Sequence, residues 1–345
     1  TWRERRIKVK IRDELFDRVL ALRGQLLEKG LRTELRHAIE TEVFDLESDL
    51  GQLRRLPSKH DPMDELHLLY LARCRVINLG DIAIQSFLGA GQRGAVFKAR
   101  HNTQGIDVAV KMLLFPRNDE EIFRFKQEST ILSALDHKAI VKCLAGFSRS
   151  SYLGVGWFAM EFVEDAKEFS YFFKNGPRDN SALAALATAC EGLEHAHSKD
   201  IIHRDVQPRN ILVDKNGNAK ILDFGCAQLS SHEHTFRPLG TLTTSAPEIF
   251  DDPRTVTSKA DIFSVGTILY RWYYQKWPFF ASSYGDAIRQ LQETSPEYQE
   301  LDSPDLEQLL KQVLRREPKE RPTASGLAIE LRRIQHDLNK SVATK

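Results

Sequence analysis

The hydrophobic pattern of the chain changes character at Ile82, and this change limits the folds open to it. Between about residues 82 and 163, short strand-like runs are separated by glycine, as in IAIQSFLGAGQRGAVFKAR, IDVAVKMLLF and GWFAMEFVE. One helical stretch, DEEIFRFKQESTILSALD, interrupts them. From about residue 180 the apolar residues keep helical spacing, with Leu183, Leu186, Cys190 and Leu193 on one face. The pattern predicts a small β-rich unit followed by a larger helical unit, with a cleft between them.

The part of the chain before Ile82 has a different, helical pattern. Apolar residues recur at helical spacing through two stretches between about residues 7 and 55, which contain no proline and are separated at Gly30. Each stretch is too short to predict a coiled coil. We expect a helical hairpin that packs on the neighbouring domain, with a dimerisation or partner-docking element as the alternative. Residues 61–75 read as a further short helix.

The composition is that of an ordinary globular protein. Of 345 residues, 41% are hydrophobic and 28% charged, and 49 Lys and Arg against 48 Asp and Glu give a net charge of +1. This balance gives no reason to expect nucleic acid or a membrane surface as a partner. No apolar run reaches the ~18 residues of a membrane span, and the four cysteines lack metal-site spacing, so we expect reduced thiols in the cytoplasm. Because the sequence starts at Thr1, we expect a fragment or a processed form from which a targeting segment could have been removed.

Two motifs in the β-rich part suit a bound nucleotide. Gly89, Gly91 and Gly94 form GxGxxG between two strand-like runs, where a tight hairpin lets backbone N–H groups approach phosphate. In VAVK, strand alternation puts Ala109 and Lys111 on one face, so that the small alanine leaves room for a flat ring and the lysine can reach phosphates. Taken alone, each motif has a plain alternative, a glycine turn and a solvated lysine.

The helical part supplies oxygen-bearing side chains near strand ends. Asp205 and Asn210 lie in HRDVQPRN, and Asp223 follows in ILDFG. Carboxylate and amide oxygens are the ligands that Mg²⁺ prefers, and phosphates can complete its shell. Asp205 could instead accept a proton from an incoming hydroxyl. Glu128, on the helical stretch, could pair with Lys111 and hold it toward the cleft, or could be an exposed helix acid.

The ordered set of segments resembles a eukaryotic-type (Hanks-type) protein kinase. GxGxxGxV, VAVK, the helix Glu, HRDxxxxN, DFG, APE, DxxSxG and RP follow in family order from about Ile82 to Asp337. The resemblance implies an α+β, bilobal fold with a small lobe at 82–160 and a large lobe at 161–340. Together these form a kinase domain at 82–340, preceded by a helical extension at 1–78. ATP and Mg²⁺ are the implied cofactors.

The resemblance also implies a role for each matched residue. The residues implied to act in catalysis are Asp205 as the base, Lys111 at the α- and β-phosphates, Glu128 orienting that lysine, and Arg209. The residues implied to contact the nucleotide are Gly89, Ala90, Gly91, Gly94, Val96, Ala109, Lys111, Met160, Glu161, Val163, Leu212 and Asp223. The implied Mg²⁺ ligands are Asn210 and Asp223. Glu248 and Arg321 would form the structural ion pair of the large lobe.

Gln207 departs from the family pattern. Ser/Thr kinases carry a lysine at this position that neutralises charge on the transferred phosphoryl group, and losing that contact could slow transfer on the order of a hundredfold. Tyrosine kinases also lack this lysine, and many carry an arginine where Arg209 stands, directly before Asn210. We therefore expect an active enzyme. A pseudokinase scaffold is the main alternative, and a small-molecule kinase is a weaker one because those enzymes typically lack the glycine hairpin and the APE–Arg pair.

The segment LGTLTTSAPE indicates which kind of hydroxyl group the enzyme phosphorylates. Gly240-Thr241 resembles the pattern of Ser/Thr kinases, although Thr244 stands where these often carry Tyr. Arg204 precedes the base, as in kinases switched on by phosphorylation of the activation loop. We expect transfer to Ser or Thr of protein substrates, and autophosphorylation chiefly at Thr235, with Ser231 and Thr241 as further candidates. The N-terminal helices would bind a partner or a second copy.

Overall fold

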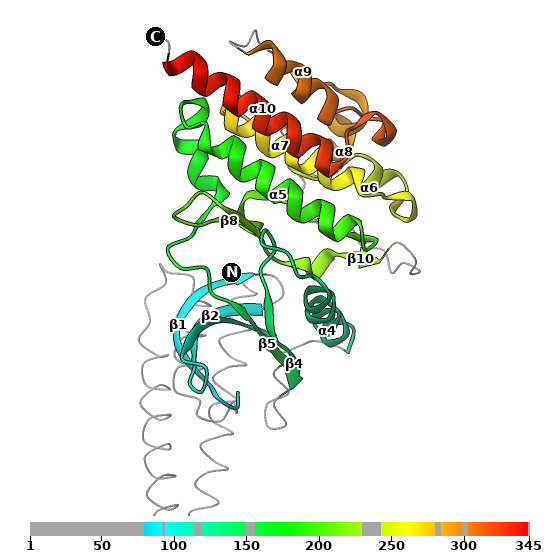
Figure 1. The fold of residues 1–345 in the computed structure, drawn as a ribbon. Helices are drawn as coiled ribbons and strands as arrows, with labels where there is room; N and C mark the ends of the chain where they lie inside the picture. Colours follow the sequence, from blue (N-terminus) through cyan, green and yellow to red (C-terminus); the bar gives the residue numbers. More distant parts are fainter. Residues whose placement is uncertain are drawn as a thin grey trace, which may run out of the picture. The chain divides into compact units, whose positions relative to one another are not determined.

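The computed structural model describes residues 79–91, 94–113, 119–149, 156–229, 243–279, 284–298 and 303–343. They belong to two compact units (Figure 1). The first contains the described residues up to Phe125 together with Ala145–Phe162, and the second contains Lys126–Leu144 and the described residues from Val163 onward. The first is β-rich and the second is largely helical, so the expected α+β class is confirmed. The helices expected within residues 1–78 lie outside the described residues.

A five-stranded sheet with the order β1-β2-β3-β5-β4 forms the first unit. Its strands are β1 (Ile82–Gly91), β2 (Gly94–His101), β3 (Ile106–Leu113), β4 (Cys143–Arg149) and β5 (Gly156–Glu161). Burial along β2 alternates as expected for a sheet with one covered face, with Ala95, Phe97 and Ala99 all fully buried. β3 is buried at every position from Val108 to Leu113, because it lies between β2 and β5.

The chain leaves this sheet through α4 (Asp119–Ala134), which begins in the first unit and ends in the second. Its first turn carries three acidic residues, which suit the positive end of the helix dipole. Phe125 anchors this end of the helix by packing on Phe158 of β5 at a ring-centroid distance of 5.1 Å and on Phe147 of β4 at 6.2 Å.

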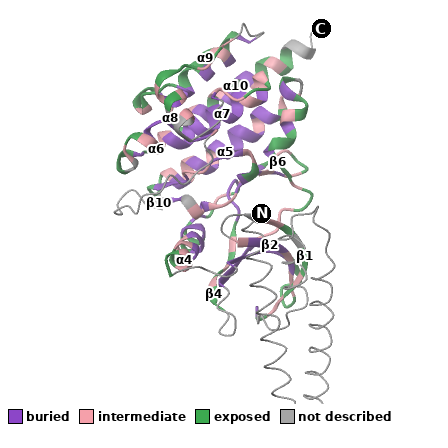
Figure 2. Ribbon diagram, turned by 180° about the vertical axis from the view of Figure 1, so that it is seen from behind, coloured by how far each residue is buried: buried purple, intermediate pink, exposed green. Residues whose placement is uncertain are grey.

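The second unit is built around α7 (Lys259–Tyr274), whose residues from Ala260 to Tyr270 are all buried. A helix covered on every side lies inside the unit. α10 (Ala324–Ala343) packs lengthwise on α5 (Ser181–His197), as Figure 1 shows. Figure 2 shows buried residues concentrated on α5 and α7. The predicted inner face of α5, with Leu183, Leu186, Cys190 and Leu193, is confirmed.

The remaining helices and short strands of this unit complete its core and position its loops. The helices are α6 (Glu248–Asp251), α8 (Tyr284–Glu293) and α9 (Pro304–Val313), with short 3₁₀ helices at Phe169–Lys174, Gly176–Arg178, Pro208–Asn210, Phe224–Cys226, Pro253–Thr255 and Pro318–Glu320. β6 (Lys167–Glu168), β8 (Ile211–Val213) and β9 (Ala219–Ile221) form one small sheet, and β7 (Ile201–Ile202) pairs with β10 (Gln228–Leu229).

Two cysteines within the described residues, Cys143 and Cys190, form no disulfide. Cys143 is half-buried and Cys190 is fully buried in the middle of α5, where burial raises the pKa of its thiol well above the usual range. Across the part of the chain that the structure describes, no helix is both long and apolar enough to cross a lipid bilayer.

Candidate active site

The first unit carries the residues predicted to surround the nucleotide base and phosphates. Gly89, Ala90 and Gly91 end β1, Gly94 and Val96 begin β2, Ala109 and Lys111 lie on β3, and Met160 and Glu161 end β5. β2 and β3 are antiparallel neighbours, and their register pairs Val96 with Lys111. Across β3, Lys111 pairs with Phe158 and Ala109 with Met160. The sheet register therefore brings Val96, Ala109, Lys111 and Met160 into adjacent positions.

Gly94 occupies a backbone conformation that requires glycine. Its φ is +136°, and a Cβ at this position would lie 2.0 Å from the carbonyl oxygen of Met112 on β3. The glycine therefore lets the start of β2 approach β3 closely, next to the strand position of Lys111.

The second unit holds the other predicted residues. Glu128 lies on α4 and is 3% exposed; Val163 follows β5; Asp205, Arg209 and Asn210 lie in the loop between β7 and β8; Leu212 lies on β8; and Asp223 follows β9. The loop from His203 to Asn210, here called the catalytic loop, contains a residue in left-handed conformation, Arg204 with φ of +64°. Such a conformation costs on the order of 1–3 kcal/mol unless its surroundings enforce it.

Asp261 of α7 enforces that conformation. The side chain is fully buried, and its carboxylate accepts hydrogen bonds from the backbone N–H groups of His203 at 2.9 Å and Arg204 at 2.8 Å. Nε2 of His197, at the end of α5, lies 2.7 Å from the same carboxylate. Burial alone would raise the pKa of Asp261, but the hydrogen bonds and charges of His197 and His203 outweigh it and lower the pKa.

Asp205 has one oxygen that is held and one that is not. Its Oδ2 accepts hydrogen bonds from Gln207 Nε2 at 2.7 Å and from Asn210 Nδ2 at 3.3 Å. Its Oδ1 is buried without a hydrogen-bond partner among the described residues. A buried polar atom in this state is uncommon and points to an interaction with a further group. Oδ1 is therefore the atom able to accept a hydroxyl proton.

Burial and neighbouring charges shift the pKa of Asp205 in opposite directions. Burial raises the pKa of the Asp205 carboxyl, and the Asp223 carboxylate adds to this rise. His203, Arg209 and the hydrogen bond from Gln207 oppose it. The Arg209 side chain is exposed, yet its charge reaches the Asp205 carboxyl.

Hydrogen bonds join the end of β9 to the catalytic loop. The backbone N–H of Leu222 donates to the carbonyl of Asn210 at 2.8 Å, and His203 Nε2 donates to the carbonyl of Leu222 at 2.8 Å. Asp223, the next residue, has φ of +59° and accepts a hydrogen bond at Oδ1 from the N–H of Gly225. These bonds bring Asn210 and Asp223 together from separate strand ends.

The donor set at Asn210 and Asp223 fits Mg²⁺. Asn210 uses its amide nitrogen to donate to the backbone carbonyl of Asp205 at 2.9 Å, which leaves its amide oxygen as the atom able to coordinate a cation. No group of three or more His, Cys, Asp or Glu side chains able to hold a metal occurs in the described ranges. Asn210 and Asp223 would offer a magnesium ion one amide and one carboxylate oxygen, and phosphate oxygens would complete its shell.

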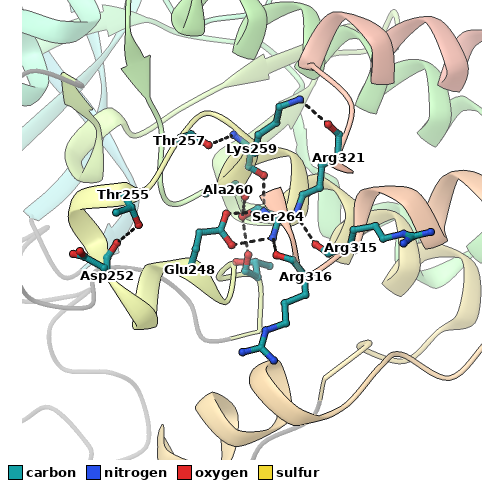
Figure 3. Close-up of polar contacts among 11 residues, drawn as sticks. Glu248, Asp252, Thr255, Thr257, Lys259, Ala260, Ser264, Arg315, Arg316 and Arg321 are labelled. Atoms are coloured by element: carbon teal, nitrogen blue, oxygen red, sulfur yellow. Dashed lines mark hydrogen bonds and ion pairs between the residues drawn. The ribbon is translucent and has the colours of Figure 1, made fainter. Parts of the chain in front are cut away.

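A buried ion pair holds the segments downstream of the catalytic loop (Figure 3). Arg321 donates from both terminal nitrogens to Glu248, at 2.6 and 2.9 Å, which confirms the pair expected from the resemblance. Arg321 also donates to the backbone carbonyls of Arg315 at 2.7 Å, Arg316 at 2.7 Å and Lys259 at 3.0 Å.

The sequence pattern missed the direct part that α7 has in the site. In SKADIFSVG, the aspartate Asp261 binds the backbone of the catalytic loop. An acidic residue inside an apolar helical run was the available signal, since a buried carboxylate needs partners. The proposed phosphorylation sites Ser231, Thr235 and Thr241 lie outside the described residues.

Comparisons with known proteins show which family the chain resembles. The family model described as Protein kinase domain matches residues 82–330. The chain is 33% identical over 224 residues to the serine/threonine-protein kinase PrkC of Bacillus subtilis, covering 63% of this chain and 34% of that protein. It is 30% identical to the serine/threonine-protein kinase PknB of Mycolicibacterium smegmatis, a match that covers 72% of this chain and 42% of that protein. It is 31% identical to the cAMP-dependent protein kinase type 3 of Saccharomyces cerevisiae, a match that covers 71% of this chain and 61% of that protein. The chain thus spans less than two thirds of each relative.

Proposed function

The chain belongs to the protein kinase family, and from this premise we propose that it is an active enzyme that transfers the γ-phosphoryl group of ATP to Ser or Thr hydroxyls of proteins. The observation that carries the proposal is the state of Asp205, with one carboxylate oxygen held by Gln207 and Asn210 and the other without a hydrogen-bond partner among the described residues. The comparisons give no support to the scaffold alternative.

Asp205 acts on the acceptor hydroxyl. Its Oδ1 accepts the hydroxyl hydrogen and orients the oxygen, which attacks the γ-phosphorus while the bond from this phosphorus to the β–γ bridging oxygen breaks. ADP leaves with the bridging oxygen, and the proton of the hydroxyl passes to Asp205. Burial, which raises the pKa of Asp205, makes the carboxylate a better proton acceptor.

The remaining site residues bind and orient the nucleotide. The glycine hairpin at Gly89–Gly94 covers the phosphates, Lys111 contacts the α- and β-phosphates, and Glu128 orients that lysine. The adenine would contact Val96, Ala109, Met160, Glu161, Val163 and Leu212. Asn210 and Asp223 would hold Mg²⁺, which when bound neutralises charge on the phosphates.

Arg209 offsets the neutral side chain of Gln207. An ammonium group at position 207 would place a positive charge beside Asp205, and glutamine places none there. The charge of Arg209 lowers the pKa of the Asp205 carboxyl. This effect supports the proposal that the electrostatic potential of Arg209 extends to the atoms that react at Asp205. Arg209 would therefore stabilise the negative charge of the transferred phosphoryl group.

A transfer assay with a generic basic protein and Mg·ATP tests the proposal, with the Asp205→Asn variant as the matched control. We expect the wild-type chain to label Ser and Thr, and the variant to lose this activity. Labelling equal to that of the variant would refute the proposal. Mass-spectrometric mapping of the same sample tests the predicted autophosphorylation at Thr235, with Ser231 and Thr241 as the further candidates.

The proposal extends to the kinase domain at 82–340 and to the N-terminal extension at 1–78, which we propose regulates the enzyme or binds a partner. Removal of residues 1–75 should change activity, stability or oligomeric state, and three unchanged measurements would contradict a regulatory role. We also propose a cytoplasmic location, which the absence of a disulfide at Cys143 and Cys190, both within the described residues, supports.

A further inference from the structure

Three basic side chains border the 3₁₀ helix Phe169–Lys174 of the second unit. Lys167 lies on β6, directly before this helix, and Arg209 lies in a 3₁₀ helix of the catalytic loop that contacts it. Arg271 lies near the end of α7, and its guanidinium carbon is 5.2 Å from the centre of the Phe173 ring. Lys167, Arg209 and Arg271 are here called the basic cluster.

The charge of the basic cluster is not neutralised by ion pairs. No acidic side chain forms an ion pair with any of its three members in the part of the chain that the structure describes. The ammonium group of Lys167 lies 4.0 Å from the centre of the Tyr171 ring, and the adjacent acid, Glu168, accepts a hydrogen bond from Ser170. The net charge of the whole chain is only +1, so this surface has a positive potential that the composition does not explain.

Arg271 is the member whose surroundings point most directly to a ligand. The residue is half-buried, and its Nη1 is covered yet has no hydrogen-bond partner among the described residues. A covered guanidinium nitrogen without an acceptor is unfavourable, and an anion that bound to it would remove this cost. The parallel N–H groups of a guanidinium match the two oxygens of a carboxylate. Arg271 is therefore suited to a carboxylate that comes from outside the chain.

The basic cluster is connected to the loop that carries the base. Arg209 follows Asp205 in this loop, is exposed, and is close enough for its charge to act on the Asp205 carboxyl. Lys167 belongs to β6, which pairs with β8 directly after the loop. The 3₁₀ helix on which Arg271 lies contacts the same loop. An extended peptide advances about 3.3–3.6 Å per residue, so side chains within a few residues of an acceptor at Asp205 can reach the cluster.

We propose that Arg271 is a specificity-determining residue that binds an Asp or Glu side chain of the protein substrate close to the acceptor hydroxyl, with Lys167 and Arg209 adding positive potential. The inference rests on the proposed function and names its substrate class, proteins with acidic residues beside the acceptor. A Lys or Arg side chain at the same place would meet like charge, which disfavours basic substrates. The basic protein of the transfer assay should therefore be labelled more slowly than an acidic protein.

The test uses serine peptides that differ at one position near the serine, which carries Glu, Gln or Lys, and each position is varied in turn. At saturating ATP we expect the wild-type chain to prefer Glu to Gln by about tenfold in kcat/KM at one position or more, and to use Lys least. Arg271→Gln should lose this preference, and Arg271→Glu should prefer Lys there. Arg271→Lys should keep part of it, because the charge remains without the fork of N–H groups.

Arg333→Gln is the matched control. Arg333 lies on α10, where its guanidinium forms an ion pair with Asp305 at 2.8 Å. This variant loses one positive charge, as Arg271→Gln does, and should keep the wild-type preference for Glu. Each preference is a ratio measured within one protein, so a variant that is only partly folded still reports it.

Two results would overturn the inference. Equal use of the Glu and Gln peptides by the wild-type chain at every position would show that no acidic side chain is recognised. A full preference for Glu in Arg271→Gln would show that Arg271 is not the residue that binds it. Failure of the proposed function looks different, since the wild-type chain would then label every peptide no faster than Asp205→Asn does.

Discussion

At the scale of single residues, Gln207 is where the chain departs from its family, and the structure gives this residue a defined contact. Its side chain is 3% exposed, and its amide nitrogen donates to the held oxygen of Asp205 at 2.7 Å. A hydrogen bond to a charged group contributes roughly 1.5–3 kcal/mol. The glutamine therefore keeps one function of a cationic side chain, orientation of the base, without its charge.

Replacement of Gln207 by alanine should lower kcat about tenfold to a hundredfold, because the carboxylate of Asp205 loses a charge-assisted hydrogen bond and becomes less well oriented. The KM for ATP should change little. Steady-state kinetics at saturating acceptor measure both quantities. Gln335→Ala on α10, where the amide donates to the carbonyl of Asn180, is the matched control. An unchanged kcat in Gln207→Ala would show that Asp205 is oriented without it.

His137 is a second residue whose environment has a measurable consequence. Its ring stacks on that of His195 with centroids 5.2 Å apart, and its Nδ1 accepts a hydrogen bond from the N–H of Ala139. The carbonyl of Ala139 accepts in turn from the N–H of Ile221 on β9. Burial, together with the charges of His195 and Lys138, lowers the pKa of His137, so folding favours the neutral ring.

The free energy of unfolding should therefore fall when the pH drops below about 6.5, the ordinary pKa of histidine in an unfolded chain. Above that value the ring is neutral in both states and has no effect. Below it the unfolded chain binds a proton more readily than the folded one. Urea unfolding at pH 5.5 and 7.5 measures the difference, which should be smaller in His137→Asn than in the exposed control His336→Asn. An equal pH dependence in both variants would contradict the assignment.

The motif residues were predictable one by one because each recurs at a fixed place in a fixed order, from the glycines of the hairpin to Asp223. The roles of Gln207 and Asp261 were not predictable in this way. Both act through hydrogen bonds to the catalytic loop, and a one-dimensional pattern does not report whether a polar side chain points into the core or toward solvent.

At the scale of elements, the strands β2 and β3 follow directly from the strand-like runs in the sequence. Both strand-like runs of the sequence form strands, and they pair antiparallel with Val96 opposite Lys111. The close approach at Gly94 was not predictable, because it depends on the position of the Met112 carbonyl across the pair.

Replacement of Gly94 by alanine should destabilise the first unit by roughly 2–4 kcal/mol, since the methyl group meets a backbone oxygen and the residue has a strained φ. Gly146→Ala on β4 is the control, because a Cβ there meets no atom within 4 Å. Thermal unfolding followed by circular dichroism measures both variants. Equal thermal stability of the two variants would mean that β2 can move away from β3 without loss of stability.

At the scale of the whole molecule, Arg321 connects segments that lie far apart in the sequence. It binds Glu248 at the start of α6, the carbonyl of Lys259 at the start of α7, and the carbonyls of Arg315 and Arg316 after α9. Its side chain is fully buried and lies over the ring of Phe263. The resemblance predicted the pair with Glu248. The contacts of Arg321 with the three backbone carbonyls and the packing of α10 on α5 could not be predicted, because helical periodicity indicates which face of a helix is buried and not the element that covers it.

Replacement of Arg321 by methionine should lower the free energy of unfolding by roughly 3–5 kcal/mol, because Glu248 is left buried without its counter-charge. The double variant with Glu248→Gln should lose less than the sum of the two single losses, since removal of the second charge relieves the first defect. Urea unfolding of all four proteins completes the cycle. Strict additivity would show that the two charges do not interact.

Cys190 gives the second unit a chemical reporter of its own opening. A thiol reacts with alkylating reagents as the thiolate, and this thiol is fully buried with a raised pKa. In a protein with Cys74, Cys143 and Cys226 changed to serine, the rate of labelling at Cys190 would report how often α5 separates from its neighbours. A ligand that tightens this unit would slow the labelling, so the cysteine offers a direct screen for molecules that bind there.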